Sequence, residues 1–297
     1  MNERTRVGVL AALLVCAAHP AWSEPAKAAK PAPTCDRAAF RVVLDVGHTP
    51  EVPGAISARG ATEFEFNLNL AKQIEQKLNE SGFTKTVLLV TTGPSRPGLL
   101  KRVTRANRMP ADLFVSIHHD SVPEVFKELW EYLGKERKFS DRFKGHSIFV
   151  SNDSPARKAS LQFARLLGLE LKAREFMYTP HYTEAFMGRY RRELVDPEAG
   201  VYRFDKLVVL RATLMPAVLL EAGSIVNRDE ELLMGSPERQ ALIGGAVSDA
   251  IDKFCAARRP ETPALVARRT AAPVAAGAAG VTFRPASATS HAAPKRP

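Results

Sequence analysis

The stretch VVLDVGH at residues 42–48 places an apolar run directly before a carboxylate, a glycine and an imidazole. The same arrangement returns at 113–120, where LFVSIHHD ends in two histidines and an aspartate, and at 218–223, where VLLEAG carries a glutamate. Short runs that are apolar throughout are typical of strands covered on both faces of a parallel sheet. Ligands bind beyond the carboxyl ends of such strands. The three stretches therefore predict reactive side chains at one edge of a sheet.

Between these runs, stretches with helical period alternate with further short apolar runs. The expected strands are residues 41–46, 86–91, 112–117, 147–151 and 217–221. Helices are expected at 65–81, 155–172 and 237–254, the last with Ser236 as N-cap and Pro237 at the first helical position. This alternation predicts an α/β fold, a single domain with a mostly parallel twisted sheet covered by helices on both faces.

The composition, 45% hydrophobic and 25% charged over 297 residues, excludes wholesale disorder and a polytopic membrane protein. Residues 1–23 are typical of a secretory signal peptide, with a basic start and an apolar centre too short to span a bilayer. We expect a linker and domain entry at 24–40, one folded domain at 41–255 and a disordered, basic, Pro/Ala-rich tail at 256–297. An exported protein is expected, in the periplasm or outside the cell.

Two cysteines remain after the expected cleavage, Cys35 and Cys255, and they stand at the two ends of the folded region. Secreted proteins form disulfides in an oxidising compartment, so we expect these cysteines to be bonded to each other. Two buried free thiols are the alternative, because spacing alone does not show that the two Cα atoms come within reach.

Imidazole and carboxylate side chains at one sheet edge suit a catalytic zinc site, which uses three protein ligands and leaves a position for water. His48 and His118 are the candidate histidine ligands. The candidates for the carboxylate ligand are Glu63, Glu65, Asp120, Asp45 and Glu221. His118 and His119 point to opposite sides of a pleated strand, so at most one of them is expected to be a ligand. Spacing alone does not choose among these residues.

Taken in order, the motifs resemble the zinc-dependent N-acetylmuramoyl-L-alanine amidases of the amidase type 3 family. The matching segments are Asp45 to His48, Gly60 to Glu63 with Asn67 and Leu68, Arg102 with Ala106 and Asn107, Ser116 to His118, and Pro216 to Glu221 with Gly223 and Asn227. Each motif is weak by itself, but their order and spacing over residues 41–254 are specific.

The resemblance implies that His48, Glu63 and His118 bind one Zn²⁺ ion and that Glu221 is the catalytic base. It implies cleavage of the amide bond between N-acetylmuramic acid and L-alanine of peptidoglycan, in cell-wall remodelling or daughter-cell separation. Peptidoglycan is therefore the expected substrate, and an activator protein is a further expected partner.

The chain departs from the family pattern beside two of these histidines. Val46 and Thr49 replace the usual proline and glycine, and His119 with Asp120 replaces a small residue and an asparagine. The candidates for contacting the ligands or the substrate are Asp45, His119, Asp120 and Arg211.

Two long segments have no assigned role. Residues 122–145 are charged with scattered aromatics and are expected to form an inserted helix, and residues 174–206 are expected to be irregular. We interpret both as solvated connections, with a binding surface or an inhibitory lid over the zinc as the alternative.

Two rival functions remain open. One is a zinc hydrolase of another amide, similar to the carboxypeptidases, in which Glu51 is the carboxylate ligand because it follows the first histidine by three residues. The other is a non-catalytic wall-binding regulator, which predicts an incomplete metal set.

The formal net charge of +10 suggests binding to a polyanion. Most of the basic excess lies in the tail at 256–297, whereas residues 35–255 are nearly neutral. We therefore expect no specific nucleic-acid partner. Screened, unspecific contact of the tail with anionic envelope polymers is the expected use of the charge.

Overall fold

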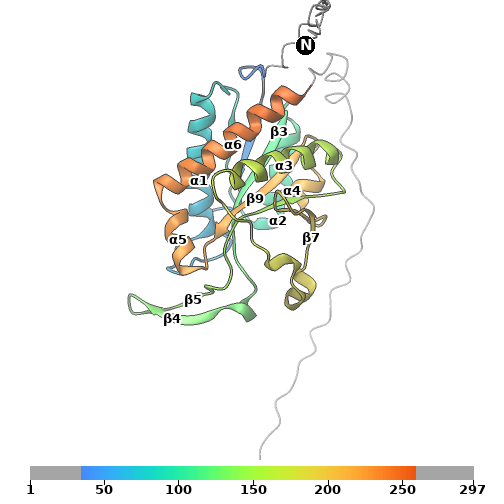
Figure 1. The fold of residues 1–297 in the computed structure, drawn as a ribbon. Coiled ribbons are helices and arrows are strands. Elements are labelled where there is room, and N and C mark those ends of the chain that lie inside the picture. The colour runs from blue at the N-terminus through green and yellow to red at the C-terminus, as the bar shows by residue number, and fades with distance from the viewer. Residues whose placement is uncertain (1–34, 259–297) are drawn as a thin grey trace, which may run out of the picture. The chain divides into compact units, whose positions relative to one another are not determined.

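A computed structural model describes residues 35–258, apart from the side chains of residues 95–97. These residues form one central sheet and a separate hairpin (Figure 1). The expected signal peptide at 1–23 lies outside the described residues, as do most of the expected linker and most of the expected tail. Within residues 35–258, no helix is long and apolar enough to cross a membrane.

The central sheet has seven strands in the order β2, β1, β3, β9, β6, β8 and β7. Their bounds are β1 Val42–Val46, β2 Val87–Leu89, β3 Leu113–Asp120, β6 Ser147–Val150, β7 Glu193–Asp196, β8 Val201–Arg203 and β9 Ala217–Ser224. Strands β2, β1, β3 and β9 run parallel to one another. β6 is antiparallel to β9 and parallel to β8, and β7 is antiparallel to β8. The predicted α/β fold with a mostly parallel sheet is confirmed, and two outer strands are reversed.

Helices cover both faces of this sheet, as predicted (Figure 1). One face carries α1 Glu63–Glu80, α3 Arg157–Lys172 and α6 Pro237–Ala257, and the other carries α2 Ser95–Asn107 and α4 Val208–Arg211. The short α5, Arg228–Met234, follows β9. The N-cap of α6 is Ser236, whose side chain accepts from the Arg239 amide, and Pro237 opens the helix.

Side chains along β1, β3 and β9 alternate between the two faces. Leu44 packs with α1 and its neighbours, whereas Val43 and Leu219 pack with α2 and α4. Because the alternation has a period of two, His118 and Glu221 belong to the α2 and α4 face. The strand pleat therefore directs both residues to the same side.

The segment at 122–145 is not the helix that the sequence suggested. It contains a short 3₁₀ turn at Glu124–Phe126 and an antiparallel hairpin of β4, Glu128–Tyr132, and β5, Lys135–Phe139. Leu133 and Gly134 both have positive φ, 52° and 72°, which is the backbone of a tight hairpin turn. Figure 1 shows the hairpin extending away from the sheet.

The segment at 174–206 is more regular than predicted. It holds two 3₁₀ turns, η2 His181–Thr183 and η3 Ala185–Tyr190, and then β7 and β8. Tyr182 packs against Phe149 of β6 with the ring centroids 5.3 Å apart. Two strands of the central sheet thus come from a region that lacks a clear apolar run.

A disulfide joins Cys35, which precedes β1, to Cys255 in α6. Their Cα atoms are 5.1 Å apart. It ties the first residues of the described chain to its last helix.

Candidate metal site

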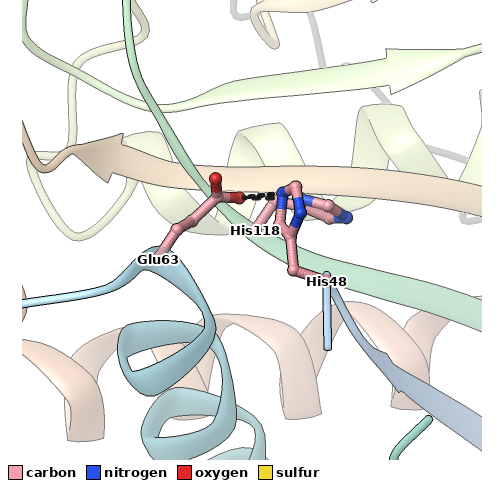
Figure 2. A group of neighbouring side chains, drawn as sticks. All are labelled: His48, Glu63 and His118. Carbon is pink, nitrogen blue, oxygen red and sulfur yellow. Dashed lines mark hydrogen bonds and ion pairs between the residues drawn. The ribbon is translucent and has the colours of Figure 1, made fainter. Parts of the chain in front are cut away.

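His48, Glu63 and His118 come together from three different elements (Figure 2). His48 lies in the loop after β1, Glu63 in the first turn of α1 and His118 on β3. Glu63 Oε1 lies 3.0 Å from His48 Nε2 and 2.9 Å from His118 Nδ1. One nitrogen or oxygen from each side chain lies within 4.8 Å of the others. Two imidazoles and one carboxylate thus converge on a volume that one ion can fill.

The DVGH loop places His48 by means of an unusual backbone. His48 has φ 66°, a left-handed backbone conformation that is uncommon for residues other than glycine. Gly47 before it has no room for a side chain, because a Cβ there would lie 2.5 Å from Cε1 of His118. The Gly47 amide also donates to the Ile117 carbonyl at 2.9 Å. The glycine therefore allows the two histidines to approach each other.

Arg102 of α2 connects the His48 loop to a buried aspartate. Its Nη2 donates to the His48 carbonyl at 2.6 Å, and its Nε lies 2.9 Å from Asp45 Oδ1. Ser116 donates to the other oxygen of Asp45 at 2.7 Å. Burial raises the pKa of Asp45 to about 6, although Arg102 and Ser116 oppose that rise. The sequence analysis named Asp45 as a candidate for contacting a ligand residue. In the structure, Asp45 acts on His48 through Arg102, which binds both Asp45 and the His48 carbonyl.

Sequence spacing did not decide whether Glu63 or Glu65 is the carboxylate ligand, but the capping of α1 distinguishes them. Glu65 turns back to the start of α1, where its Oε2 accepts from the Thr62 amide at 2.8 Å and Thr62 Oγ1 caps the Glu65 amide. Such a capping box occupies the carboxylate of the third helical residue. The side chain of Glu63, at the first position, is left to face the histidines.

Glu51, the rival ligand, lies elsewhere. Its Oε2 accepts from the Gly93 amide at 2.8 Å, and it does not belong to the group formed by His48, Glu63 and His118. Within residues 35–258, the carboxylate that groups with the two histidines is that of Glu63.

Glu63 is held ionised although it is buried. Burial by itself would raise its pKa, but hydrogen bonds with His118 and His48 lower the pKa below its usual range. The Ala55 amide donates to Glu63 Oε2 at 3.0 Å, and Gly54 before it leaves no room for a side chain beside this carboxylate. An ionised carboxylate and two partly buried imidazoles form a donor set that suits a divalent cation such as Zn²⁺.

Glu221 lies beside His118 on the neighbouring strand. The two residues are partners in the parallel register of β3 and β9. Burial raises the pKa of Glu221 well above its usual value, and the nearby carboxylates of Asp120 and Glu63 raise it further. Glu221 Oε2 is buried without a hydrogen-bond partner among the described residues. A carboxyl group with a raised pKa and a free oxygen is suited to proton transfer.

His119 points to the opposite face from His118, as the pleat predicts. Its Nδ1 lies 2.8 Å from Asn67 Oδ1, and burial lowers its pKa to about 3. Asn67 Nδ2 in turn donates to the Gly47 carbonyl at 3.3 Å and to Glu63 Oε1 at 3.4 Å. His119 thus touches the site only through Asn67, and it keeps that amide oriented.

Asp120 closes β3 at the wall of the site. The Tyr182 hydroxyl donates to both of its oxygens at 2.9 Å, and the Ser121 amide donates to Oδ1 at 2.7 Å. Burial raises the pKa of Asp120 to about 7. Asp120 therefore anchors the 174–206 segment beside the candidate metal site.

Arg211 lies outside this group. It ends α4, and its side chain is exposed and makes no hydrogen bond or ion pair within residues 35–258. The residue after it, Ala212, accepts from Asn107 Nδ2 at 2.9 Å, which places this turn beside the end of α2.

Three functional contacts were missed by sequence reasoning. Arg102 and Asn67 belong to the quoted motifs, but their hydrogen bonds to the His48 and Gly47 carbonyls had no signal in the sequence. Tyr182 stands in a segment without a recognisable pattern. The sequence could have drawn attention to Arg102 and Asn67 as motif residues of unknown role, but not to Tyr182.

A cavity of about 300 Å³ opens beside Glu221. Its other walls come from the chain after β3 and from the 174–206 segment with the residues that follow it, including Tyr182, Tyr190, Arg192 and Leu207. The candidate base therefore faces a space that can receive part of a substrate.

Comparison with known proteins identifies the family of the chain. The family model for N-acetylmuramoyl-L-alanine amidase matches residues 42–253. N-acetylmuramoyl-L-alanine amidase AmiA of Escherichia coli (strain K12) is 25% identical over 228 residues, which cover 72% of this chain and 75% of that protein.

Solved structures show the same fold. The catalytic domain of the amidase CwlV from Bacillus (Paenibacillus) polymyxa var. colistinus matches with a TM-score of 0.52 at 25% identity, covering 72% of this chain and 97% of that one. The amidase Ami1 from Mycobacterium smegmatis matches with a TM-score of 0.57 at 19% identity, covering 75% of this chain and 99% of that one.

Proposed function

The chain belongs to the N-acetylmuramoyl-L-alanine amidase family, a family of peptidoglycan amidases, and we propose that it acts with one Zn²⁺ ion held by His48, Glu63 and His118 and with Glu221 as the catalytic base. The bond cut is the amide between N-acetylmuramic acid and L-alanine. The observation that carries the proposal is the register of β3 and β9, which puts Glu221 next to the ligand His118. Three ligands and an adjacent free carboxyl are the parts that a hydrolytic zinc site requires.

The donor set fits the metal on chemical grounds. Glu63 is ionised, and burial lowers the pKa of His118, so that this imidazole is neutral at pH 7. Zinc binds deprotonated carboxylate and neutral imidazole. When bound, zinc supplies Lewis acidity toward a water molecule and toward the carbonyl oxygen of the amide.

Glu221 carries the proton through the reaction. It takes a proton from the attacking water as the water oxygen bonds to the amide carbon, and it delivers that proton to the alanine nitrogen as the carbon–nitrogen bond breaks. Its Oε2, which has no hydrogen-bond partner among the described residues, is free to take up this proton and to hand it on. The products are a carboxylic acid on the muramic acid and a peptide with a free L-alanine amine.

Arg102 and Asn67 orient the ligands. Arg102 fixes the His48 carbonyl while Asp45 holds the guanidinium, and Asn67 donates to both the Gly47 carbonyl and Glu63. Partners that bind ligand residues in this way commonly tune metal affinity.

The rival functions have less support. A carboxypeptidase-like site with Glu51 as ligand needs a side chain that is instead bonded to the Gly93 amide. A non-catalytic wall-binding regulator needs no complete ligand set, whereas His48, Glu63 and His118 lie together beside Glu221.

The test is zinc content and product analysis on purified peptidoglycan, with Glu221→Gln compared with wild type. We expect the variant to keep zinc and to lose about 10²- to 10⁴-fold of the activity, since general acid–base catalysis is worth that much. Wild type should release stem peptides that begin with L-alanine. Glu51→Gln is the matched control and should retain zinc and activity.

Two results would contradict the proposal. Activity of Glu221→Gln close to that of wild type would reject Glu221 as the base. Cleavage inside the stem peptide, with zinc lost in Glu51→Gln, would favour the carboxypeptidase-like alternative.

Export and envelope contact complete the proposal. Residues 1–23 would direct the chain out of the cytoplasm, to the compartment in which its substrate lies. The basic tail would hold the protein near anionic polymers of the envelope. Removing residues 259–297 should weaken binding to isolated envelopes at low salt and leave zinc binding unchanged. Equal binding of the trimmed and full-length proteins would reject this role for the tail.

An activator protein stays a proposed partner, and pull-down with a zinc-loaded protein is its test.

A further inference from the structure

The cavity beside Glu221 contains one charged side chain that the hydrolytic mechanism does not use. Arg192, in the chain between η3 and β7, lines this cavity together with Glu221, Tyr182, Phe204 and Leu207. It is the only arginine or lysine among the lining residues. The cavity thus places a cation in the same space as the candidate base.

Arg192 is held firmly from one side. Its backbone amide donates to the Tyr182 carbonyl at 2.8 Å, and its guanidinium carbon lies 3.7 Å from the centre of the Phe204 ring. Nη1 donates to the carbonyls of Arg191 at 2.8 Å and Arg189 at 3.3 Å. These contacts fix the plane of the guanidinium before any ligand arrives.

The opposite edge of the guanidinium has no acceptor within residues 35–258. Nε is buried without a hydrogen-bond partner, and Nη2 makes no hydrogen bond or ion pair. Asp120 is close enough to affect the pKa of Arg192, but it makes no hydrogen bond or ion pair with that guanidinium and accepts instead from Tyr182 and Ser121. A guanidinium edge that is shielded from water and has no acceptor is costly, although Nη1 on the other side is satisfied, and an incoming carboxylate can remove that cost.

The two unused nitrogens, Nε and Nη2, form one of the two edges with which arginine binds carboxylates in a bidentate manner. The walls formed by Phe204 and Leu207 are apolar and suit the aliphatic part of a short peptide. A peptide whose scissile amide lies at Glu221 would therefore enter the space that Arg192 borders.

We propose that Arg192 is a specificity-determining residue, which binds a free carboxylate of the stem peptide close to the scissile amide. This rests on the proposed amidase function, because that function places the peptide beside Glu221. The ligand class is an acidic peptide whose residue after L-alanine carries a free carboxyl group. A peptide with a carboxamide at that position would leave the guanidinium edge without a charged partner.

The experiment measures binding apart from catalysis. Zinc-loaded full-length Glu221→Gln protein is titrated calorimetrically with an L-alanyl-D-glutamyl stem peptide and with its carboxamide counterpart. We expect the free acid to bind at least about tenfold more tightly, as a charge-assisted bidentate pair allows. Adding Arg192→Gln should abolish that difference, and Arg192→Lys should restore only part of it.

Arg189→Gln is the matched control, because this exposed arginine of the same segment does not line the cavity. It should leave the preference for the free acid unchanged. Thermal unfolding of each variant shows whether it is folded, and Arg192→Lys keeps the test informative if Arg192→Gln is not.

Equal affinity for the two peptides in protein with Arg192 intact would overturn the proposal, as would a preference that survives in Arg192→Gln. Failure of the wild-type enzyme to hydrolyse peptidoglycan would instead count against the proposed function. Binding and hydrolysis are measured separately, so the two failures can be distinguished.

Discussion

The parallel part of the sheet, β2, β1, β3 and β9, and the outer part, β6, β8 and β7, serve the site in different ways. The parallel part supplies Asp45, His118 and Glu221 directly from its strands, in positions set by register. The outer part supplies none of these side chains, and the segment 174–192 between β6 and β7 forms part of the wall of the cavity. The parallel strands thus fix His118 and Glu221 by their register, whereas Tyr182 and Arg192 reach the cavity from a connection that packs beside it.

The largest effect on stability is expected from removing the disulfide that joins the chain before β1 to α6. Replacing both Cys35 and Cys255 with serine removes a cross-link between residues 220 positions apart. The chain-entropy model assigns such a link about 5 kcal/mol of unfolding free energy. Denaturant unfolding of the double variant against wild type measures this loss, and zinc content under native conditions should be unchanged. A loss below about 1 kcal/mol would mean that the unfolded chain is compact without the link.

A second prediction contrasts two aspartates, one in each part of the sheet. Asp45→Asn weakens the hold on Arg102 and so on the His48 carbonyl, and zinc affinity should fall about 10- to 100-fold. Asp205→Asn is the control, because Asp205 accepts from the Asn152 amide in the outer part, far from the ligands in sequence. Chelator competition measures both affinities. Equal effects of the two substitutions would show that Asp45 has no special role in positioning.

In the outer part of the sheet, His146 should make the free energy of unfolding fall as the pH is lowered. Burial lowers the pKa of His146 from 6.5 to about 4, and neither ring nitrogen has a partner among the described residues. The unfolded chain therefore binds a proton first as the pH falls, so stability is lost from about pH 6.5 down to about pH 4 and then levels off. Between pH 7 and pH 5 the loss should be about 2 kcal/mol.

His146→Leu cannot take up this proton, so its unfolding free energy should fall less over the same range. Denaturant unfolding of both proteins at the two pH values measures the difference. The same pH dependence in both would place the acid sensitivity elsewhere, for example at His181, whose pKa burial also lowers to about 4.

The smallest effect is expected at the hairpin of β4 and β5. Trp130 donates from Nε1 to the Ala58 carbonyl at 3.0 Å, and the guanidinium carbons of Arg59 and Arg228 lie 5.5 and 5.1 Å from its ring centre. Trp130→Ala should cost about 1 kcal/mol of unfolding free energy, which is the scale of partly exposed aromatic and cation–π contacts. Zinc content should be unchanged. Loss of zinc in this variant would show that the hairpin supports the metal site.

Much of the fold was predictable because the signals are local. The strands that carry the site begin as short apolar runs and carry their polar residues toward their carboxyl ends. Helix α1 repeats apolar residues at Leu70, Ile74 and Leu78, all of which are buried. Residues 122–145 were expected to form a helix, and this prediction is wrong because residues 128–139 form a hairpin. Its aromatics Trp130 and Tyr132 are two residues apart, which is the period of a strand, but charged residues between them obscure it.

For the site, local sequence patterns name the candidate ligands, and motif order supplies the resemblance that ranks them. Their arrangement is a property of the folded chain. Folding turned Glu65 back onto Thr62, left Glu63 facing the histidines and placed Arg102 under the His48 carbonyl. It also brought Arg192 to the cavity beside Glu221, 29 positions away in the chain. The physical reason is that residue types and periods are local properties, whereas register, burial and the partner of each hydrogen bond depend on segments that meet only in the folded chain.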